Sequence, residues 1–206
     1  LFYSGVLLKS VRGYPKEAQQ LARFLTKLGL TPASHKDLYF SAMAAAGKTP
    51  GDYSGKMVLN LSPKMRSDEA AKIILRQLLD VIKNNQEYVK QDIDTEFLHD
   101  FRVAVRRTRS ALTQIKYVFP AETTDHFKQN FAAIGGISNQ LRDLDVYLLD
   151  EQTYRAMLPA ALQQDIDPLF GYLRQKRASA LQDVITGLNS FDYAWVLKEW
   201  EAFLDT

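Results

Sequence analysis

The chain has 206 residues, of which 46% are hydrophobic, and 26 basic against 24 acidic side chains give a net charge of +2. Such a length and apolar content predict one large globular domain, or one and a half smaller ones. The lack of cysteine excludes a disulfide framework and a thiolate zinc site, and no apolar run reaches the roughly 18 residues of a membrane span. The first ten residues also lack the basic flank and cleavage site of a signal peptide. We therefore expect a cytoplasmic protein without a membrane partner.

Residues 1–62 differ from the rest because Gly and Pro interrupt every long period. A helix is predicted at about Pro15–Leu28, with Pro in its first turn and Gly29 after its end. The alternation in Met57–Pro63 favours a short strand. We expect a small lead segment that is mixed α/β or irregular.

From Ser67 onward the apolar residues recur with a helical period, and Ser67 is a plausible N-cap followed by acidic residues. Gly135 and Gly136 predict a kink or a close helix crossing. The fold class is therefore all-α, an antiparallel helical bundle over residues 63–206. After the helix that starts at Ser67 and buries Ile74, Leu78, Val81 and Tyr88, the expected helices are about Thr95–Val118, Thr124–Leu149, Ala160–Leu188 with a restart at Asp167, and Tyr193–Leu204.

The second of these helices carries an unusual row of cations. At about 100° per residue, His99, Arg102, Arg106 and Arg109 fall within roughly 80° of one another, away from most of the Phe, Val and Leu positions. We call these four residues the basic stripe. Neighbours on such a row repel each other unless an anion bridges them, and guanidinium groups bind phosphate or carboxylate oxygens bidentately. The stripe therefore predicts an anion-binding face, with the histidine as a hydrogen-bond donor to the anion.

Other helices repeat the pattern. Lys128, Gly135, Asn139 and Arg142 share one line of the third helix, and Arg174 and Arg177 form a basic turn of the fourth. Lys72, Arg76, Lys83 and Lys90 align on the first helix, where a solvated face paired with Glu69, Asp80 and Glu87 is the simpler interpretation. For Asp143 and Asp145, we expect a role in orienting arginines rather than in holding a metal.

Two segments resemble the signatures of one family, the CHAD or conserved histidine α-helical domain. "FLHDFRVAVRRTRSAL" is similar to its H-D-x-R-V-x-x-R-R-x-R signature, and "LRDLDVYLL", about thirty residues later, to R-D-x-D-V. The resemblance covers about Pro63 to Thr206. It implies non-catalytic binding of long-chain inorganic polyphosphate in a basic groove, without metal or cofactor. The ligand-facing positions it implies are His99, Arg102, Arg106, Arg109 and Arg142, then Arg107 and Lys116; the basic lines add Lys72, Arg76, Lys128, Arg174 and Arg177 as lesser candidates.

The resemblance also raises expectations about the whole protein. The family usually has two helical halves, each with its own His and Arg set, and this chain matches the first. A homodimer or a second CHAD half would then complete it. Residues 1–62 are a candidate for the end of a CYTH-like region, and any triphosphatase activity would belong to an upstream CYTH domain. Association with polyphosphate granules is a corresponding expectation for its location.

Three other functions compete with this interpretation. Binding of RNA or DNA predicts aromatic side chains among the arginines, and the stripe has none. Recruitment of an acidic protein partner is compatible with a basic face. A metal-dependent phosphohydrolase could start from the pair His99 and Asp100, but it needs further converging ligands, and the remaining histidines are His35 and His126.

Overall fold

The computed structural model describes residues 6, 8–9, 13–32, 43, 57 and 59–206. The chain divides into two compact units, Leu1–Ser54 and Gly55–Thr206. In the first unit, α1 (Pro15–Lys27) confirms the predicted helix: Pro15 occupies its first turn, and Gly29 has the positive φ of 87° typical of a helix end. His35 and much of the remaining lead segment lie outside the described residues.

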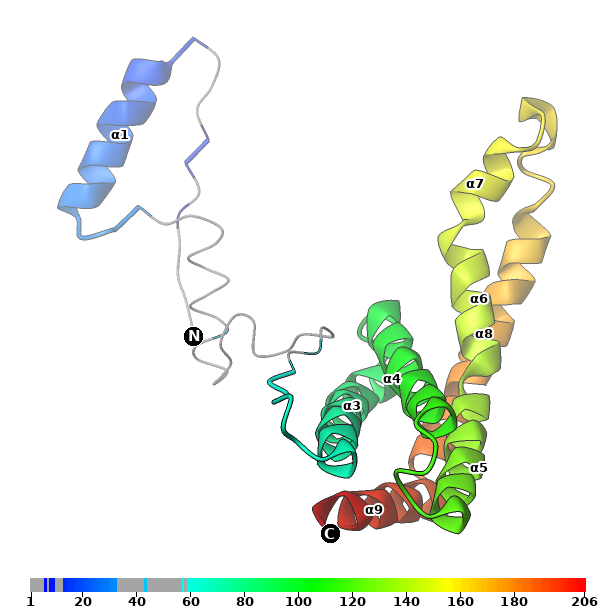
Figure 1. Cartoon of the computed structure of the whole chain (residues 1–206). Coiled ribbons are helices and arrows are strands. Elements are labelled where there is room, and N and C mark those ends of the chain that lie inside the picture. The colour runs from blue at the N-terminus through cyan, green and yellow to red at the C-terminus, as the bar shows by residue number, and fades with distance from the viewer. Residues whose placement is uncertain (1–5, 7, 10–12, 33–42, 44–56, 58) are drawn as a thin grey trace. The chain divides into compact units, whose positions relative to one another are not determined.

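The regular secondary structure in the described part of the second unit is all helical (Figure 1). The described residues of Met57–Pro63, which exclude Val58, belong to no strand, so the mixed α/β character expected of the lead segment is not observed there. The antiparallel bundle order stays a prediction. The helices are α3 (Ser67–Lys90), α4 (Thr95–Gln114), α5 (Ala121–Ile137), α6 (Asn139–Leu149), α7 (Glu151–Ala156), the 3₁₀ turn η1 (Ala160–Leu162), α8 (Asp167–Leu188) and α9 (Phe191–Asp205).

The core of this unit is assembled from α3, α4, α5, α6, α8 and α9. Trp200 of α9 is fully buried and makes edge contacts with two aromatic rings of α5, 4.5 Å from Phe127 and 5.3 Å from Phe131 between ring centroids. Burying aromatic side chains of this size stabilises the fold by about 1.5–3 kcal/mol each. The helices that carry the basic residues are thus fixed to one rigid centre.

The buried face of α3 differs from the predicted one. Leu75, Leu79 and Ile82 are at most 1% exposed, whereas the predicted Ile74 and Val81 lie at the edge of the core and are partly exposed. The periodicity identified the helix correctly but placed the centre of its stripe one residue too early. Both neighbouring rows are apolar, and packing against α4 and α9 determines which one is central.

Helix α4 begins and ends at well-defined signals. The side chain of Asp94 caps its start by accepting a hydrogen bond from the Glu96 amide at 2.8 Å. The helix ends at Gln114, four residues earlier than expected, because the chain turns at Tyr117, whose φ is 64°. Pro120 then precedes α5, so α4 and α5 are adjacent helices joined by a short loop.

The predicted third helix is divided in two, but not at its glycines. Gly135 and Gly136 both lie within α5, and the break comes at Ser138, which is fully buried. A Cβ atom at Gly135 would lie 3.6 Å from Val105 Cγ1, so the expected close crossing of α4 and α5 does occur at this glycine. The six-residue α7 was not predicted, and Ala160–Asp167 contains only η1 before α8 begins.

Candidate functional site: a cationic pocket between α4 and α5

The α4 helix separates its apolar and basic side chains onto different faces. Phe101, Val105 and Leu112 are at most 4% exposed and belong to the core. Arg106 and Arg109 lie outside this buried face and are exposed. This segregation follows from the 3.6-residue period of the helix, since the arginines occur where the apolar positions do not.

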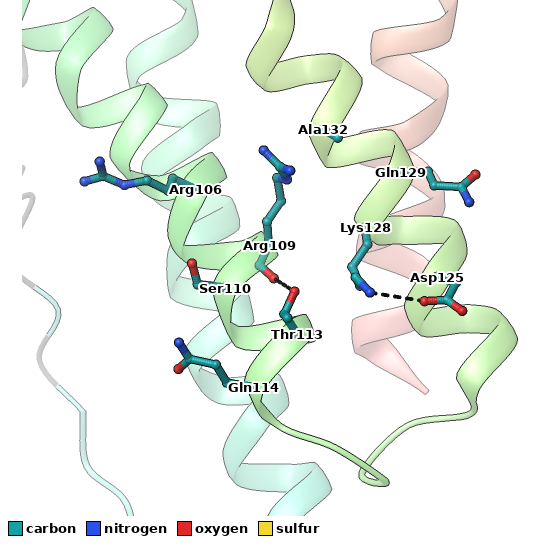
Figure 2. A pocket seen from close by; sticks show the side chains of 9 residues that line it. All are labelled: Arg106, Arg109, Ser110, Thr113, Gln114, Asp125, Lys128, Gln129 and Ala132. Atoms are coloured by element: carbon teal, nitrogen blue, oxygen red, sulfur yellow. Dashed lines mark hydrogen bonds and ion pairs between the residues drawn. The ribbon is translucent and has the colours of Figure 1, made fainter.

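A pocket of about 530 Å³ lies between the C-terminal half of α4 and the N-terminal half of α5, and we call it the α4–α5 pocket. In Figure 2, Arg109 and Lys128 extend into the space between the two helices, whereas the guanidinium group of Arg106 is turned away from α5. The pocket is lined by Arg106, Arg109, Ser110, Thr113, Gln114, Asp125, Lys128, Gln129 and Ala132.

The charges in the pocket are only partly balanced. Lys128 Nζ donates to Asp125 Oδ1 at 3.2 Å, and Asp125 is the one carboxylate among the described lining residues. Neither Arg106 nor Arg109 has an ion pair or side-chain hydrogen bond with any residue of the described part of the chain. Two guanidinium groups therefore remain available to an external anion. The described lining includes hydroxyl and amide groups but no aromatic ring.

Arg102 lies on the same stripe but is already bound by the protein. Its Nη1 donates to Ser138 Oγ at 2.8 Å and Asn139 Oδ1 at 2.9 Å, with a longer contact of 3.4 Å to the carbonyl of Gly135. These partners are the residues of the α5–α6 break. Arg102 therefore ties α4 to that junction and satisfies polar groups left there by the interrupted helix.

The electrostatic surroundings of Arg102 show that other cations are close. Its pKa lies below the ordinary value, first because the guanidinium is partly buried. Asp143 opposes this shift, while the positive charges of Arg142 and Arg106 lower the pKa further. The structure thus brings together arginines of α4 and α6 that are more than thirty residues apart in sequence.

The remaining ligand candidates of the two signatures have different positions. Arg142 of α6 has a buried Nη1 without a hydrogen-bond partner in the described residues, and its charge acts on both Arg102 and Asp145. His99 is partly buried one turn before Arg102 and does not line the pocket. Arg107 is exposed on another face of α4, beside a small hollow of about 10 Å³ that includes Met57. Lys116 is exposed in the loop after α4.

The basic line of α3 faces α9 rather than solvent. Lys83 Nζ lies 2.6 Å from Glu201 Oε1, and Arg76 pairs with both Glu201 and Asp205. Lys72 donates to the hydroxyl of Thr206 at 3.2 Å. The solvated-face interpretation is therefore wrong for Arg76 and Lys83, because carboxylates distant in sequence neutralise them. Lys72 is directed to the hydroxyl of Thr206, and both Lys72 and Arg76 lie outside the pocket. The fourth member, Lys90, does pair with Glu87 as expected, at 2.5 Å.

Arg177 of α8 also proves to be a structural cation. It donates to Asp145 at 2.6 Å and to both carboxylate oxygens of Asp92 at 2.7 and 2.8 Å. Asp92 is the first cause of the raised pKa of Arg177, and in return Arg177 lowers the pKa of Asp92. Asp145 is 1% exposed, and burial raises its pKa despite this partner. The interpretation of Asp145 as an arginine-orienting residue thus fits its contacts.

Arg174, the other basic residue of that turn, pairs with Glu151 of α7. Sequence analysis did not reveal this pair, or the bond of Arg177 with Asp92, because the partners are 23 and 85 positions away. Arg174 and Arg177 therefore do not join the α4–α5 pocket.

The described residues contain no group of three or more His, Cys, Asp or Glu side chains that could hold a metal ion. His126 instead lies 2.9 Å from Glu199 of α9. Among the helices described, none is long and apolar enough to cross a membrane.

Comparison with known proteins adds one positive result. A protein-family model described as the CHAD domain matches residues 73–206, which is more than half of the chain. The match contains both signatures, the α4–α5 pocket and every helix from α4 to α9. No curated protein matches the chain.

Proposed function

Because the chain belongs to the CHAD domain family, we propose that it binds inorganic polyphosphate in the α4–α5 pocket, with Arg102 and Arg142 extending the site toward α6. The observation that carries the proposal is the pair of unpartnered guanidinium groups of Arg106 and Arg109 beside this pocket. Elsewhere in the described unit, basic side chains with similar spacing are paired with carboxylates.

The geometry favours a linear anion of high charge density. Residues three and four positions apart on a helix are about 5–6 Å from each other, so successive cations of the basic stripe form a row. A compact anion can neutralise one or two of them, whereas a chain of phosphoryl groups can bridge the row and remove the repulsion between all its members. Arg142 and Lys128 flank the row from α6 and α5.

We propose binding without cleavage. The cationic groups at the site can hold phosphate oxygens, but a guanidinium group stays protonated and cannot serve as a general base. The carboxylate of the pocket, Asp125, is engaged by Lys128. Any triphosphatase activity is assigned by this proposal to a separate CYTH domain.

The proposal includes a setting for the protein. We place it in the cytoplasm, in association with polyphosphate, and we propose that a second copy or a second CHAD half supplies a further row of cations. Lys116 and His99 would then contact the ligand outside the α4–α5 pocket. Arg107 lies on another face of α4 and is not assigned to the ligand. Lys72, Arg76, Arg174 and Arg177 are left out because their charges are neutralised within the protein or, for Lys72, directed to α9.

The test is a competition experiment at fixed salt. Fluorescently labelled long-chain polyphosphate is bound to the protein and displaced with unlabelled polyphosphate or with single-stranded RNA of matched total charge. We expect polyphosphate to displace the probe at a much lower concentration, since the described pocket offers no ring on which a base could stack. Equal displacement by RNA would contradict polyphosphate specificity, and phosphate release in the presence of Mg²⁺ or Mn²⁺ would contradict binding without cleavage.

A further inference from the structure

Asp125 is an unusual residue for a pocket proposed to bind anions, because it is the one carboxylate among the described lining residues. It comes from the N-terminal part of α5, its side chain is 67% exposed, and it lines the same pocket as Arg106 and Arg109. Figure 2 shows its carboxylate facing Lys128, whose side chain extends toward α4. The core does not require this carboxylate, since the residue is exposed and its bond to Lys128 is made at the surface.

We infer that Asp125 is a specificity-determining residue. Its carboxylate pairs with Lys128 and competes with incoming anions for that lysine, so that only ligands already bound by the arginines of α4 compete effectively. This inference rests on the proposed function for the identity of the ligand, but not for the effect of the carboxylate. Any anion that reaches Lys128 must displace or approach the negative charge of Asp125, and like charges at short range repel.

A tethered competitor acts differently on short and long ligands. The carboxylate is attached three residues from Lys128 and is therefore always present at high local concentration. A free diphosphate has no comparable advantage. A long chain held by Arg106 and Arg109 delivers its next phosphoryl group at an effective concentration in the millimolar range, because the second contact is intramolecular. Asp125 should therefore penalise short anions more than long ones.

The experiment compares Asp125→Asn with the wild type on two probes, pyrophosphate and long-chain polyphosphate, at one low salt concentration. The substitution removes the charge and keeps the shape of the side chain. We expect the variant to bind long-chain polyphosphate about two- to fivefold more tightly and to gain more for pyrophosphate. Asp183→Asn is the matched control, because Asp183 is an exposed carboxylate of α8 that does not line the pocket.

A second variant, Lys128→Ala, distinguishes an effect of the Asp125–Lys128 pair from a general effect of net charge. In a Lys128→Ala protein, the increase in affinity caused by Asp125→Asn should be smaller, because the lysine for which the carboxylate competes is then missing. Unchanged or weaker binding by Asp125→Asn, or an equal gain from Asp183→Asn, would overturn the inference. Equal gains for both probes would overturn its selectivity.

A third ligand, dextran sulfate, distinguishes this inference from the proposed function. If Asp125→Asn tightens binding of the sulfated polymer and the wild type shows no preference for polyphosphate, the role of Asp125 stands and polyphosphate specificity fails. If the wild type prefers polyphosphate and Asp125→Asn changes nothing, the role of Asp125 fails and the proposed function stands. If none of these anions binds either protein, both are overturned.

Discussion

Replacing Arg109 by Ala should separate ligand binding from folding more cleanly than any other substitution in the site. The side chain extends into the α4–α5 pocket and is exposed, and its guanidinium group has no partner in the described part of the chain. Its loss should therefore remove a contact with the ligand and break no ion pair or side-chain hydrogen bond among the described residues.

The expected size of the effect follows from this exposure. An exposed charged contact contributes about 0.2–1 kcal/mol, and a bidentate guanidinium–phosphate contact somewhat more. A loss of roughly 0.5–1.4 kcal/mol corresponds to a two- to tenfold increase in Kd for polyphosphate at low salt. Since one fewer cation is neutralised, the slope of log Kd against log salt should also decrease by about one. An exposed arginine-to-alanine change within a helix should alter stability by less than about 0.5 kcal/mol, so Tm should stay nearly constant.

Arg107→Ala is the matched control for this measurement. It removes the same charge from an adjacent, exposed position of the same helix, but on a face away from the pocket. Fluorescence titrations at three salt concentrations, with thermal melts of both variants, would give the comparison. Equal weakening by the two substitutions would refute the pocket as the binding site and indicate a diffuse charge effect. A large fall in Tm for Arg109→Ala would refute the claim that this arginine is free.

Three further predictions concern the paired cations. Arg102→Ala should weaken binding and also lower Tm, because it breaks the bonds to Ser138 and the α5–α6 junction; unchanged Tm would mean that the junction does not depend on them. Asp92→Asn should destabilise the protein at neutral pH, because Arg177 lowers the pKa of Asp92 in the folded state. The deficit should be complete above the unfolded-state pKa of about 4 and should be lost as the pH falls through the lower pKa of the folded state. A pH-independent deficit in melts would contradict the pairing with Arg177. Arg76→Ala should lower Tm through the lost contacts with α9 and leave polyphosphate affinity within about twofold, and a larger loss of affinity would place α3 in the site.

The sequence predicted the basic stripe well because its information is local. The positions of Arg106 and Arg109 relative to Val105 and Leu112 follow from helical periodicity alone, and the structure leaves the arginines exposed and buries the apolar residues. The lengths of the helices were less predictable. The end of α4 depends on the backbone at Tyr117, and a non-glycine residue with positive φ gives no reliable local signal.

The α5–α6 break shows why non-local contacts limit such predictions. Two consecutive glycines were the obvious candidates for a kink, yet both remain helical, and the break occurs at the buried Ser138. Arg102 of α4 donates to Ser138 and Asn139, so a side chain more than thirty positions earlier satisfies polar groups at the break. Helix propensity within the segment contains no information about that partner.

The contrast between α3 and α4 explains what makes a basic row a ligand site. Both helices carry cations at spacings that bring them onto one line, and periodicity cannot distinguish the two rows. In α3, the carboxylates of Glu201 and Asp205 approach from α9 and neutralise Arg76 and Lys83. No carboxylate of the described residues pairs with the arginines that line the α4–α5 pocket, and its one acidic residue is engaged by a lysine. Unbalanced charge beside a cavity, rather than positive charge itself, is therefore the property that points to an anion site.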